Sequence, residues 1–241
     1  MICLATTTAI VPAAGKGERA GDRAGGKLFA PLLDRPLLAW TLQTLVACPE
    51  IDEIILVSRV DRLAKVEALV SDYGGAQVSR VVPGGEERLD SVLCGVRALS
   101  PDADYVVIHD GARPLCPEAV FARTFAAARA HGAAIAAIRA TDTVKQATAN
   151  DWIERTLERR HLWLAQTPQI FERSLFERAC EAAHAGGVAA TDDAALVERL
   201  GHPVRLVEGS RLNLKVTLPQ DFAIAEALLR LRQAGGAAWS E

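Results

Sequence analysis

The sequence has few aromatic residues, few lysines and no excess of positive charge. Aromatic residues make up 5% of its 241 residues, and 27 basic residues stand against 30 acidic ones, a formal net charge of −3. A mildly acidic chain without a basic block is a poor candidate for sequence-independent nucleic-acid binding, which depends on neutralising many phosphates. Four of the lysines fall in segments that stand out on other grounds; the full set is Lys16, Lys27, Lys65, Lys145 and Lys215.

A long uninterrupted apolar run is also missing. The most apolar stretch, residues 119–138, is broken by Arg123, Arg129, His131 and Gly132, and it falls short of the roughly 18 apolar residues of a membrane span. The segment MICLATTTAIVPAAG has no basic region and runs directly into a strand pattern, so we expect no signal peptide. With 50% hydrophobic and 24% charged residues, the composition predicts an ordinary soluble globular protein.

Closely spaced cysteines are absent. The five cysteines are odd in number, widely separated and form no C-x-x-C pair, which argues against a disulfide framework and against a zinc site. The pattern is typical of reduced thiols in the cytosol. We therefore interpret each of them as a small buried apolar side chain: Cys3, Cys48, Cys94, Cys116 and Cys180.

Apolar runs of strand length alternate with segments of helical period over the first 140 residues. This alternation predicts an α/β fold, a mostly parallel twisted sheet with helices on both faces. The expected strands are 8–12, 53–58, 77–82, 104–109, 133–138 and 203–207. The expected helices are 36–47, 62–73, 86–99, 118–131, 173–185, 192–200 and 219–233, after which we expect a frayed tail from residue 234.

The region 139–164 breaks this alternation. Its short polar-alternating runs, 143–146, 152–157 and 162–165, predict a β-arm or hairpin that stands off the sheet. With no repeat and no linker elsewhere, the sequence predicts one domain, 1–241, carrying an arm at about 139–164.

The loop after the first strand, residues 13–27, fits two familiar motifs imperfectly. A dinucleotide fingerprint, Gly15-x-Gly17-x-x-Ala20, should continue into a helix, but glycines follow within a turn. The pattern G-x-x-x-x-G-K of a P-loop matches 21–27, yet Leu28 offers no hydroxyl to Mg²⁺.

The composition of the same loop is more informative than either motif. Small residues allow backbone N–H groups to approach an anion closely, and cations converge on the same segment. This combination at the end of a first strand favours a nucleoside triphosphate, whereas a solvated surface loop is the alternative. The small residues are Ala13, Ala14, Gly15, Gly17, Gly25 and Gly26, and the cations are Lys16, Arg19, Arg23 and Lys27.

Polar residues also follow later strands. Asp110 stands at the carboxyl end of an expected strand, where open α/β sheets bind ligands, and it could hold Mg²⁺ or form a turn. We interpret His109 as satisfied by backbone and not as a base. The segment 84–91 could line the same cleft or cap a helix, and Thr191-Asp192-Asp193 is most simply a helix N-cap.

Taken in order, the motifs resemble the 2-C-methyl-D-erythritol 4-phosphate cytidylyltransferases of the non-mevalonate isoprenoid pathway. The similarity extends over about residues 9–227. Gly26 stands where the family usually has proline, Gly111 where alanine is more usual, and the spacing from Arg19 to Lys27 is one residue longer. The motifs are VPAAGxGxR, GGxxRxDSV, HDxARP, DTVK, LWxAQTPQ, TDDA and NLKVTxPxD.

The resemblance implies a nucleotidyltransferase-type, Rossmann-like fold, a homodimer built by interlocking arms, and Mg²⁺ or another divalent cation as cofactor. It implies that CTP is bound by Ala13, Ala14, Gly15, Gly17, Gly85, Glu86, Ser91, Asp110 and Gly111, with Asp110 also near the metal. It implies that Arg113, Thr143, Arg159, Thr167 and Lys215 bind the acceptor phosphate, and that Arg19, Lys27, Arg159 and Lys215 are catalytic.

The expected reaction is transfer of CMP from CTP to methylerythritol phosphate, which releases pyrophosphate. A phosphate monoester is already nucleophilic near neutral pH, so no general base is required, and no Ser/His/Asp set is evident. A cytidylyltransferase for another polyol phosphate, such as ribitol 5-phosphate, remains an alternative. From a different class, a nucleotide-binding oxidoreductase or a non-catalytic ligand-binding regulator is disfavoured by the broken helix and the extra cations.

Overall fold

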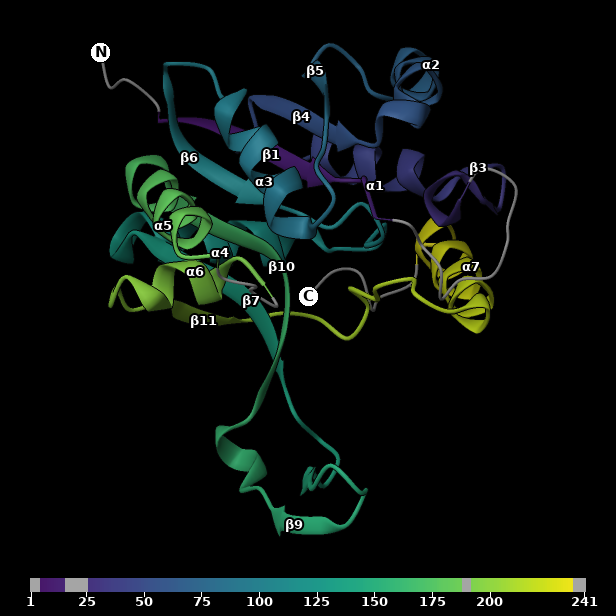
Figure 1. The fold of residues 1–241 in the computed structure, drawn as a ribbon. Helices are drawn as coiled ribbons and strands as arrows, with labels where there is room; N and C mark the ends of the chain where they lie inside the picture. Colours follow the sequence, from purple (N-terminus) through teal and green to yellow (C-terminus); the bar gives the residue numbers. More distant parts are fainter. Residues whose placement is uncertain (1–4, 16–25, 188–191, 236–241) are drawn as a thin grey trace.

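The computed structural model describes residues 5–15, 26–187 and 192–235 and is built around one seven-stranded sheet (Figure 1). The strands lie in the order β11-β7-β10-β6-β1-β4-β5. Their bounds are β1 Thr6–Pro12, β4 Glu53–Ser58, β5 Val78–Pro83, β6 Ala103–Ile108, β7 Ala133–Arg139, β10 Trp163–Glu172 and β11 Arg205–Glu208.

The sheet is mostly parallel, as the sequence predicts. β1 pairs in parallel with β4 and β6, β4 with β5, and β11 with β7. β10 is antiparallel to both of its neighbours, β6 and β7. The chain order changes direction at β1, because β4 and β5 lie on one side of it and β6 on the other.

Helices cover both faces of the sheet. Successive side chains of a strand point to opposite faces, so Ala9 and Val11 of β1 pack with one set of helices and Ile10 with the other. The first set is α1 Leu37–Val46, α2 Leu63–Tyr73 and α4 Glu118–His131. The second is α3 Arg88–Arg97, α5 Arg173–Ala185 and α6 Ala194–Arg199.

A smaller apolar cluster joins the last helix, α7 Pro219–Gln233, to the segment that follows the first loop. Phe222, Ala225 and Leu229 of α7 pack with Leu32 and Trp40. The short elements of this region are η2 Lys27–Phe29, β2 Pro31–Leu32 and β3 Arg35–Pro36, and η3 Val60–Arg62 precedes α2.

The predicted elements of the first 140 residues are present, and the helices expected at 118–131, 173–185 and 219–233 have these bounds in the structure. The expected helix at 86–99 begins later, at Arg88. Glu87 is its N-cap residue, and the Glu87 N–H donates to the Asp90 carboxylate. The expected tail falls largely on residues 236–241, outside the described residues.

The prediction for residues 162–165 was wrong. These residues are not a third strand of the arm but lie at the start of β10, where Trp163 pairs with Arg139 of β7. The predicted strand ends at Ala165 because Thr167, Pro168 and Gln169 form a polar cluster of the kind found at the ends of elements. In the structure they lie within β10, where the register shifts between Ala165 and Gln169 and the Thr167–Pro168 peptide is cis.

The remaining part of 139–164 projects from the body of the molecule (Figure 1). It contains a two-stranded antiparallel sheet, β8 Lys145–Ala147 with β9 Ile153–Thr156, followed by η4 Arg159–His161. The arm leaves the sheet from the carboxyl end of β7 and returns at the beginning of β10. Its apolar side chains are uncovered in this single chain, with Trp152 75% and Ile153 66% exposed.

The four described cysteines are free thiols. Three of them are buried as predicted, and burial raises the pKa of Cys48 and of Cys180 to about 12. Cys94 is only half-buried, and Cys3 lies outside the described residues. Among the helices of the described ranges, none has both the length and the apolar character needed to cross a membrane.

The packing of α3 on the sheet yields a test of the fold. A Cβ at Gly95 would lie 2.5 Å from Ile10 Cγ2 and 3.1 Å from Val57 Cγ2. Alanine favours helices by about 1 kcal/mol over glycine, but overpacking a core costs about 1–3 kcal/mol. We expect Gly95→Ala to lower the free energy of unfolding in urea. An increase would contradict this packing, and Ser71→Ala on the exposed side of α2 serves as the control.

Candidate functional site

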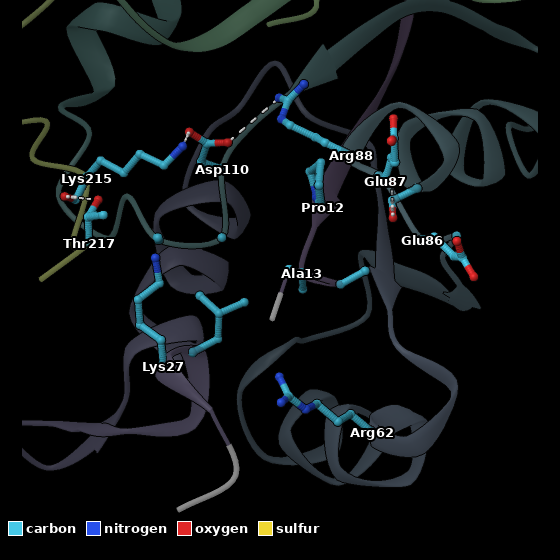
Figure 2. Close-up of a pocket in the computed structure, with 17 residues that line it drawn as sticks. Pro12, Ala13, Lys27, Arg62, Glu86, Glu87, Arg88, Asp110, Lys215 and Thr217 are labelled. Atoms are coloured by element: carbon cyan, nitrogen blue, oxygen red, sulfur yellow. Dashed lines mark hydrogen bonds and ion pairs between the residues drawn. The ribbon is translucent and has the colours of Figure 1, made fainter. Parts of the chain in front are cut away.

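A cavity of about 660 Å³ opens at the carboxyl ends of β5, β4, β1 and β6 (Figure 2). The sheet's change of direction at β1 places it where open α/β folds bind ligands. The η2 segment and the segment after β11 complete its walls. The lining residues are Pro12, Ala13, Ala14, Gly15, Lys27, Leu28, Arg62, Gly85, Glu86, Glu87, Arg88, Ser91, Asp110, Gly111, Ala112, Lys215 and Thr217.

The Asp110 carboxylate is the centre of an ionic network in this cavity. Lys215 Nζ lies 2.9 Å from Asp110 Oδ2, Arg113 Nε lies 3.4 Å from the same oxygen, and Arg88 Nη2 lies 3.8 Å from Oδ1. Figure 2 shows Lys215 and Arg88 reaching Asp110 from opposite sides. One carboxylate therefore gathers three cations that come from three different segments.

This network determines the charge of Asp110. Burial alone would raise the pKa of Asp110, but the nearby charges of Lys215, Arg113 and Arg88 outweigh burial and lower the pKa to about 2. The carboxylate is therefore ionised throughout the physiological range and can accept hydrogen bonds or bind a cation.

A buried ion pair fixes Arg88. Its guanidinium makes a bidentate pair with Asp193, Nη1 to Oδ1 at 2.8 Å and Nη2 to Oδ2 at 2.6 Å. Burial opposes the charge on Arg88, but Asp193, with Asp110, raises the pKa of Arg88 above its ordinary value. The predicted N-cap of α6 is present: Asp193 stands at the N-cap position and Asp192 accepts from the Ala195 N–H, but the carboxylate of Asp193 pairs with Arg88 and does not cap the helix. Thr191 lies outside the described residues.

A chain of hydrogen bonds fixes the loop that carries Asp110. The Asp110 N–H donates to Thr167 Oγ1 at 3.0 Å, Thr167 Oγ1 lies 3.1 Å from His109 Nδ1, and His109 Nε2 lies 3.2 Å from the Arg113 carbonyl. A carbonyl only accepts, so the His109 proton belongs on Nε2 and the Thr167 hydroxyl donates to Nδ1. Burial lowers the pKa of His109 to about 4, which keeps the imidazole neutral.

A second set of bonds fixes the segment that carries Lys215. Arg113 Nη1 donates to the Asn213 carbonyl at 2.7 Å, and Asn213 Nδ2 donates to the Thr167 carbonyl at 2.7 Å. The Val216 N–H donates to the Ala112 carbonyl at 2.9 Å. β10, the Asp110 loop and the Lys215 segment are therefore one connected unit.

The structure brings together ten of the predicted site residues: Ala13, Ala14, Gly15, Lys27, Gly85, Glu86, Ser91, Asp110, Gly111 and Lys215 line the cavity. Arg113 and Thr167 are buried behind it, where they position its loops and do not line it. Thr143 and Arg159 are exposed on the arm, outside the cavity, and Arg159 donates to the Thr141 carbonyl. Arg19 and Gly17 lie outside the described residues.

Two charged residues of the site carry no prediction of a binding role from the sequence: Arg62, which lines the cavity, and Asp193, which pairs with Arg88. Arg62 follows a strand without any motif. For Arg88 the sequence left two alternatives, a place in the cleft or in a helix cap, and the structure shows that it lines the cavity. Asp193 could have been recognised only through its distant partner, 105 positions away in the chain. Lone charges of this kind give no signal in one sequence, because their partners are set by the tertiary fold.

The residues present fit a divalent cation that arrives with a nucleotide. Among the described residues no cluster of three or more His, Cys, Asp or Glu could hold a metal alone. Mg²⁺ typically takes one or two carboxylates plus phosphate oxygens and waters, and Asp110 offers one ionised carboxylate inside the cavity. Phosphates would have to supply most of the remaining ligands.

Comparison with known proteins matches most of the chain to one family model. The family model described as 2-C-methyl-D-erythritol 4-phosphate cytidylyltransferase matches residues 7–231. Relatives of that name from Pelotomaculum thermopropionicum and Synechococcus elongatus are 43% and 44% identical; the alignments cover 93% of this chain and 94% and 96% of theirs.

Solved structures show the same architecture. The 4-diphosphocytidyl-2C-methyl-D-erythritol synthase of Anaerococcus prevotii has a TM-score of 0.83 at 33% identity, covering 94% of this chain and 96% of that one. The 2-C-methyl-D-erythritol 4-phosphate cytidylyltransferase of Thermus thermophilus has a TM-score of 0.74 at 33% identity, covering 93% and 99%. These matches show the nucleotidyltransferase-like α/β fold that the sequence predicts.

The lowered pKa of Asp110 predicts a pH dependence of stability. The folded-state value of about 2 lies below the ordinary 3.8, so the stabilisation is complete above pH 4 and is lost as the pH falls towards 2. It amounts to about 2 kcal/mol. We expect Asp110→Asn to lower the free energy of unfolding at pH 7 and to flatten its decline between pH 4 and 2.

Urea unfolding at several pH values measures this difference. Asp102→Asn, in the exposed turn before β6, is the matched control and should follow wild type. Parallel curves for wild type and Asp110→Asn across that window would show that the three cations do not hold Asp110 as described.

Proposed function

The chain belongs to the 2-C-methyl-D-erythritol 4-phosphate cytidylyltransferase family and is therefore a cytidylyltransferase; on this basis we propose how its cavity performs the transfer. CTP and methylerythritol phosphate react in it to give 4-diphosphocytidyl-2-C-methyl-D-erythritol and pyrophosphate. The observation that supports this most is that Lys27, Lys215 and Arg88 line one cavity together with the buried carboxylate of Asp110, at the carboxyl edge of the sheet.

The proposed step is direct attack. An oxygen of the acceptor phosphate forms a bond to the α-phosphorus of CTP, and the bond from that phosphorus to the α,β-bridging oxygen breaks. Pyrophosphate leaves with the electron pair. A phosphate monoester with a second pKa near ~6 is largely dianionic at neutral pH, so the step needs no proton acceptor. The buried neutral His109, bonded on both ring nitrogens, agrees with this.

The barrier comes from two anions that repel each other and from charge that grows on pyrophosphate. We assign the backbone of Ala13, Ala14 and Gly15 to the phosphates, as donors at the end of β1. Gly85, Glu86 and Ser91 would contact the cytosine, and Asp110 and Gly111 the ribose. Lys27 and Lys215 would stabilise the developing charge and orient the acceptor, with Arg19 of the preceding loop in the same role.

A divalent cation, Mg²⁺ or one that replaces it, would be held by Asp110 together with the phosphates of CTP. When bound it would neutralise phosphate charge. The pairing of Asp110 with Lys215 keeps the carboxylate ionised in the absence of that cation.

We further propose a homodimer in which the arm, residues 139–164, completes the neighbouring site. Thr143 and Arg159 are exposed on the arm and lie outside the cavity of their own chain, while Trp152 and Ile153 expose apolar surface that a second copy would cover. In this arrangement Arg159 of the partner subunit would hold the acceptor phosphate together with Lys215, and buried Arg113 and Thr167 would shape the acceptor end.

Pyrophosphate release with CTP, Mg²⁺ and methylerythritol phosphate tests the proposed function. We expect turnover with CTP and not with ATP, GTP or UTP, and with methylerythritol phosphate and not with ribitol 5-phosphate. Release with ribitol 5-phosphate and not with methylerythritol phosphate would show that the acceptor is the alternative polyol phosphate. If neither acceptor gives release but CTP raises the melting temperature, the result would support CTP binding and contradict both proposed acceptor substrates.

Mixed dimers test the shared site. Lys27→Ala and Arg159→Ala should each lower the rate by on the order of 10²–10³, as removal of a single stabilising group commonly does. If Arg159 acts in the partner's cavity, a mixed dimer of the two variants carries one intact site, so random exchange of equal amounts should restore roughly a quarter of wild-type activity.

Activity that stays at the level of the separate variants, with subunit exchange verified by differently tagged chains, would contradict a site shared across the dimer. Arg155→Ala, at the exposed end of β9, is the matched control on the arm and should retain most of the activity.

A further inference from the structure

Arg62 is a lining residue that neither the motifs nor the proposed roles include. It ends η3, directly after β4 and before α2, and it lines the cavity together with Gly15 and Lys27. Figure 2 shows its guanidinium directed into the cavity, across from Lys215 and below Ala13. The side chain is half-buried.

The guanidinium has no hydrogen bond or ion pair with another side chain in the described ranges. Asp61 attracts it electrostatically, but the Asp61 carboxylate is bonded to Arg59, with Arg59 Nε 2.8 Å from Oδ1. Arg88 and Lys215, by contrast, are already paired with carboxylates. Five N–H donors in a planar fork therefore face the cavity without a bound acceptor.

The backbone at Gly26 makes room for this arginine. A Cβ at position 26 would lie 2.6 Å from Arg62 Nη1 and 3.0 Å from Cζ, so a side chain there would force the guanidinium to move from this position. Gly26 also has a φ of +93°, which proline cannot adopt. The glycine that stands where the family usually has proline thus leaves the Arg62 guanidinium its place next to position 26.

We propose that Arg62 binds the β- and γ-phosphates of the nucleoside triphosphate and stabilises the pyrophosphate as it leaves. The inference rests on the proposed function. In a direct displacement the attacking and leaving oxygens lie on opposite sides of the α-phosphorus, so with the acceptor at Lys215 the pyrophosphate lies on the opposite side of the cavity, where Arg62 is. The guanidinium fork matches two phosphate oxygens, and no proton changes place.

Calorimetric titration with CTP, CMP and pyrophosphate in Mg²⁺ buffer tests this role. Loss of a charge-assisted bidentate contact should raise the Kd of CTP and of pyrophosphate roughly tenfold in Arg62→Ala. The Kd of CMP, which lacks both phosphates, should stay at the wild-type value. Arg62→Gln should change the three Kd values as Arg62→Ala does. Gly26→Ala should also raise the Kd of CTP, because the added methyl group displaces the Arg62 guanidinium.

Arg97→Ala is the matched control, since it removes one positive charge from an exposed position at the end of α3, outside the cavity. Equal losses for CTP and CMP, or no loss for either, would overturn the proposal, as would an equal effect of Arg97→Ala. Turnover by wild type in the same buffer separates the two claims. If wild type converts CTP and methylerythritol phosphate while Arg62→Ala binds CTP normally, only the role of Arg62 fails; if wild type binds no CTP, both fail.

Discussion

The buried carboxylate of Asp110 is the interaction on which the cavity depends. Without a ligand, Lys215, Arg113 and Arg88 would repel one another, and Asp110 compensates their charge. Removing one partner from such a charge cluster destabilises the fold, because the remaining charges stay uncompensated. Asp193 compensates part of this positive charge by pairing with Arg88. The cations are therefore positioned before any phosphate arrives. This fixed arrangement is what electrostatic stabilisation of a transition state requires.

The positions of these charges follow from the topology of the sheet. The loops after β5, β4, β1 and β6 meet at one edge, and the hydrogen bonds of Thr167 and Asn213 attach β10 and the Lys215 segment to the same place. β10 runs antiparallel to β6 and β7. Its first residue, Trp163, therefore pairs with Arg139 at the carboxyl end of β7, and Gln169 pairs with Ile108 at the carboxyl end of β6. The arm begins and ends at this edge too, which supports the proposal that it reaches a neighbouring site.

Local periodicity was sufficient to predict most of this framework. Strand-length apolar runs and helices with clear ends gave the mostly parallel sheet, and Asp110 was recognised because a carboxylate follows a strand. Two kinds of feature could not be predicted from the sequence. The continuation of β10 through Thr167 and Pro168 depends on buried partners in β6 and β7 that override a turn-like sequence. The roles of Arg62, Arg88 and Asp193 depend on contacts that only folding creates, such as the close approach of Gly26 to Arg62.

Three cations hold Asp110 ionised inside the cavity, and the titration of this carboxyl can be observed directly. Carbon NMR of the ¹³C-labelled aspartate carboxyls, with Asp110→Asn to assign the resonance, follows its titration in the folded protein. We expect the Asp110 resonance to stay at its ionised position as the pH falls to about 3, since the pKa lies near 2. A midpoint at or above the ordinary value of 3.8 would contradict it.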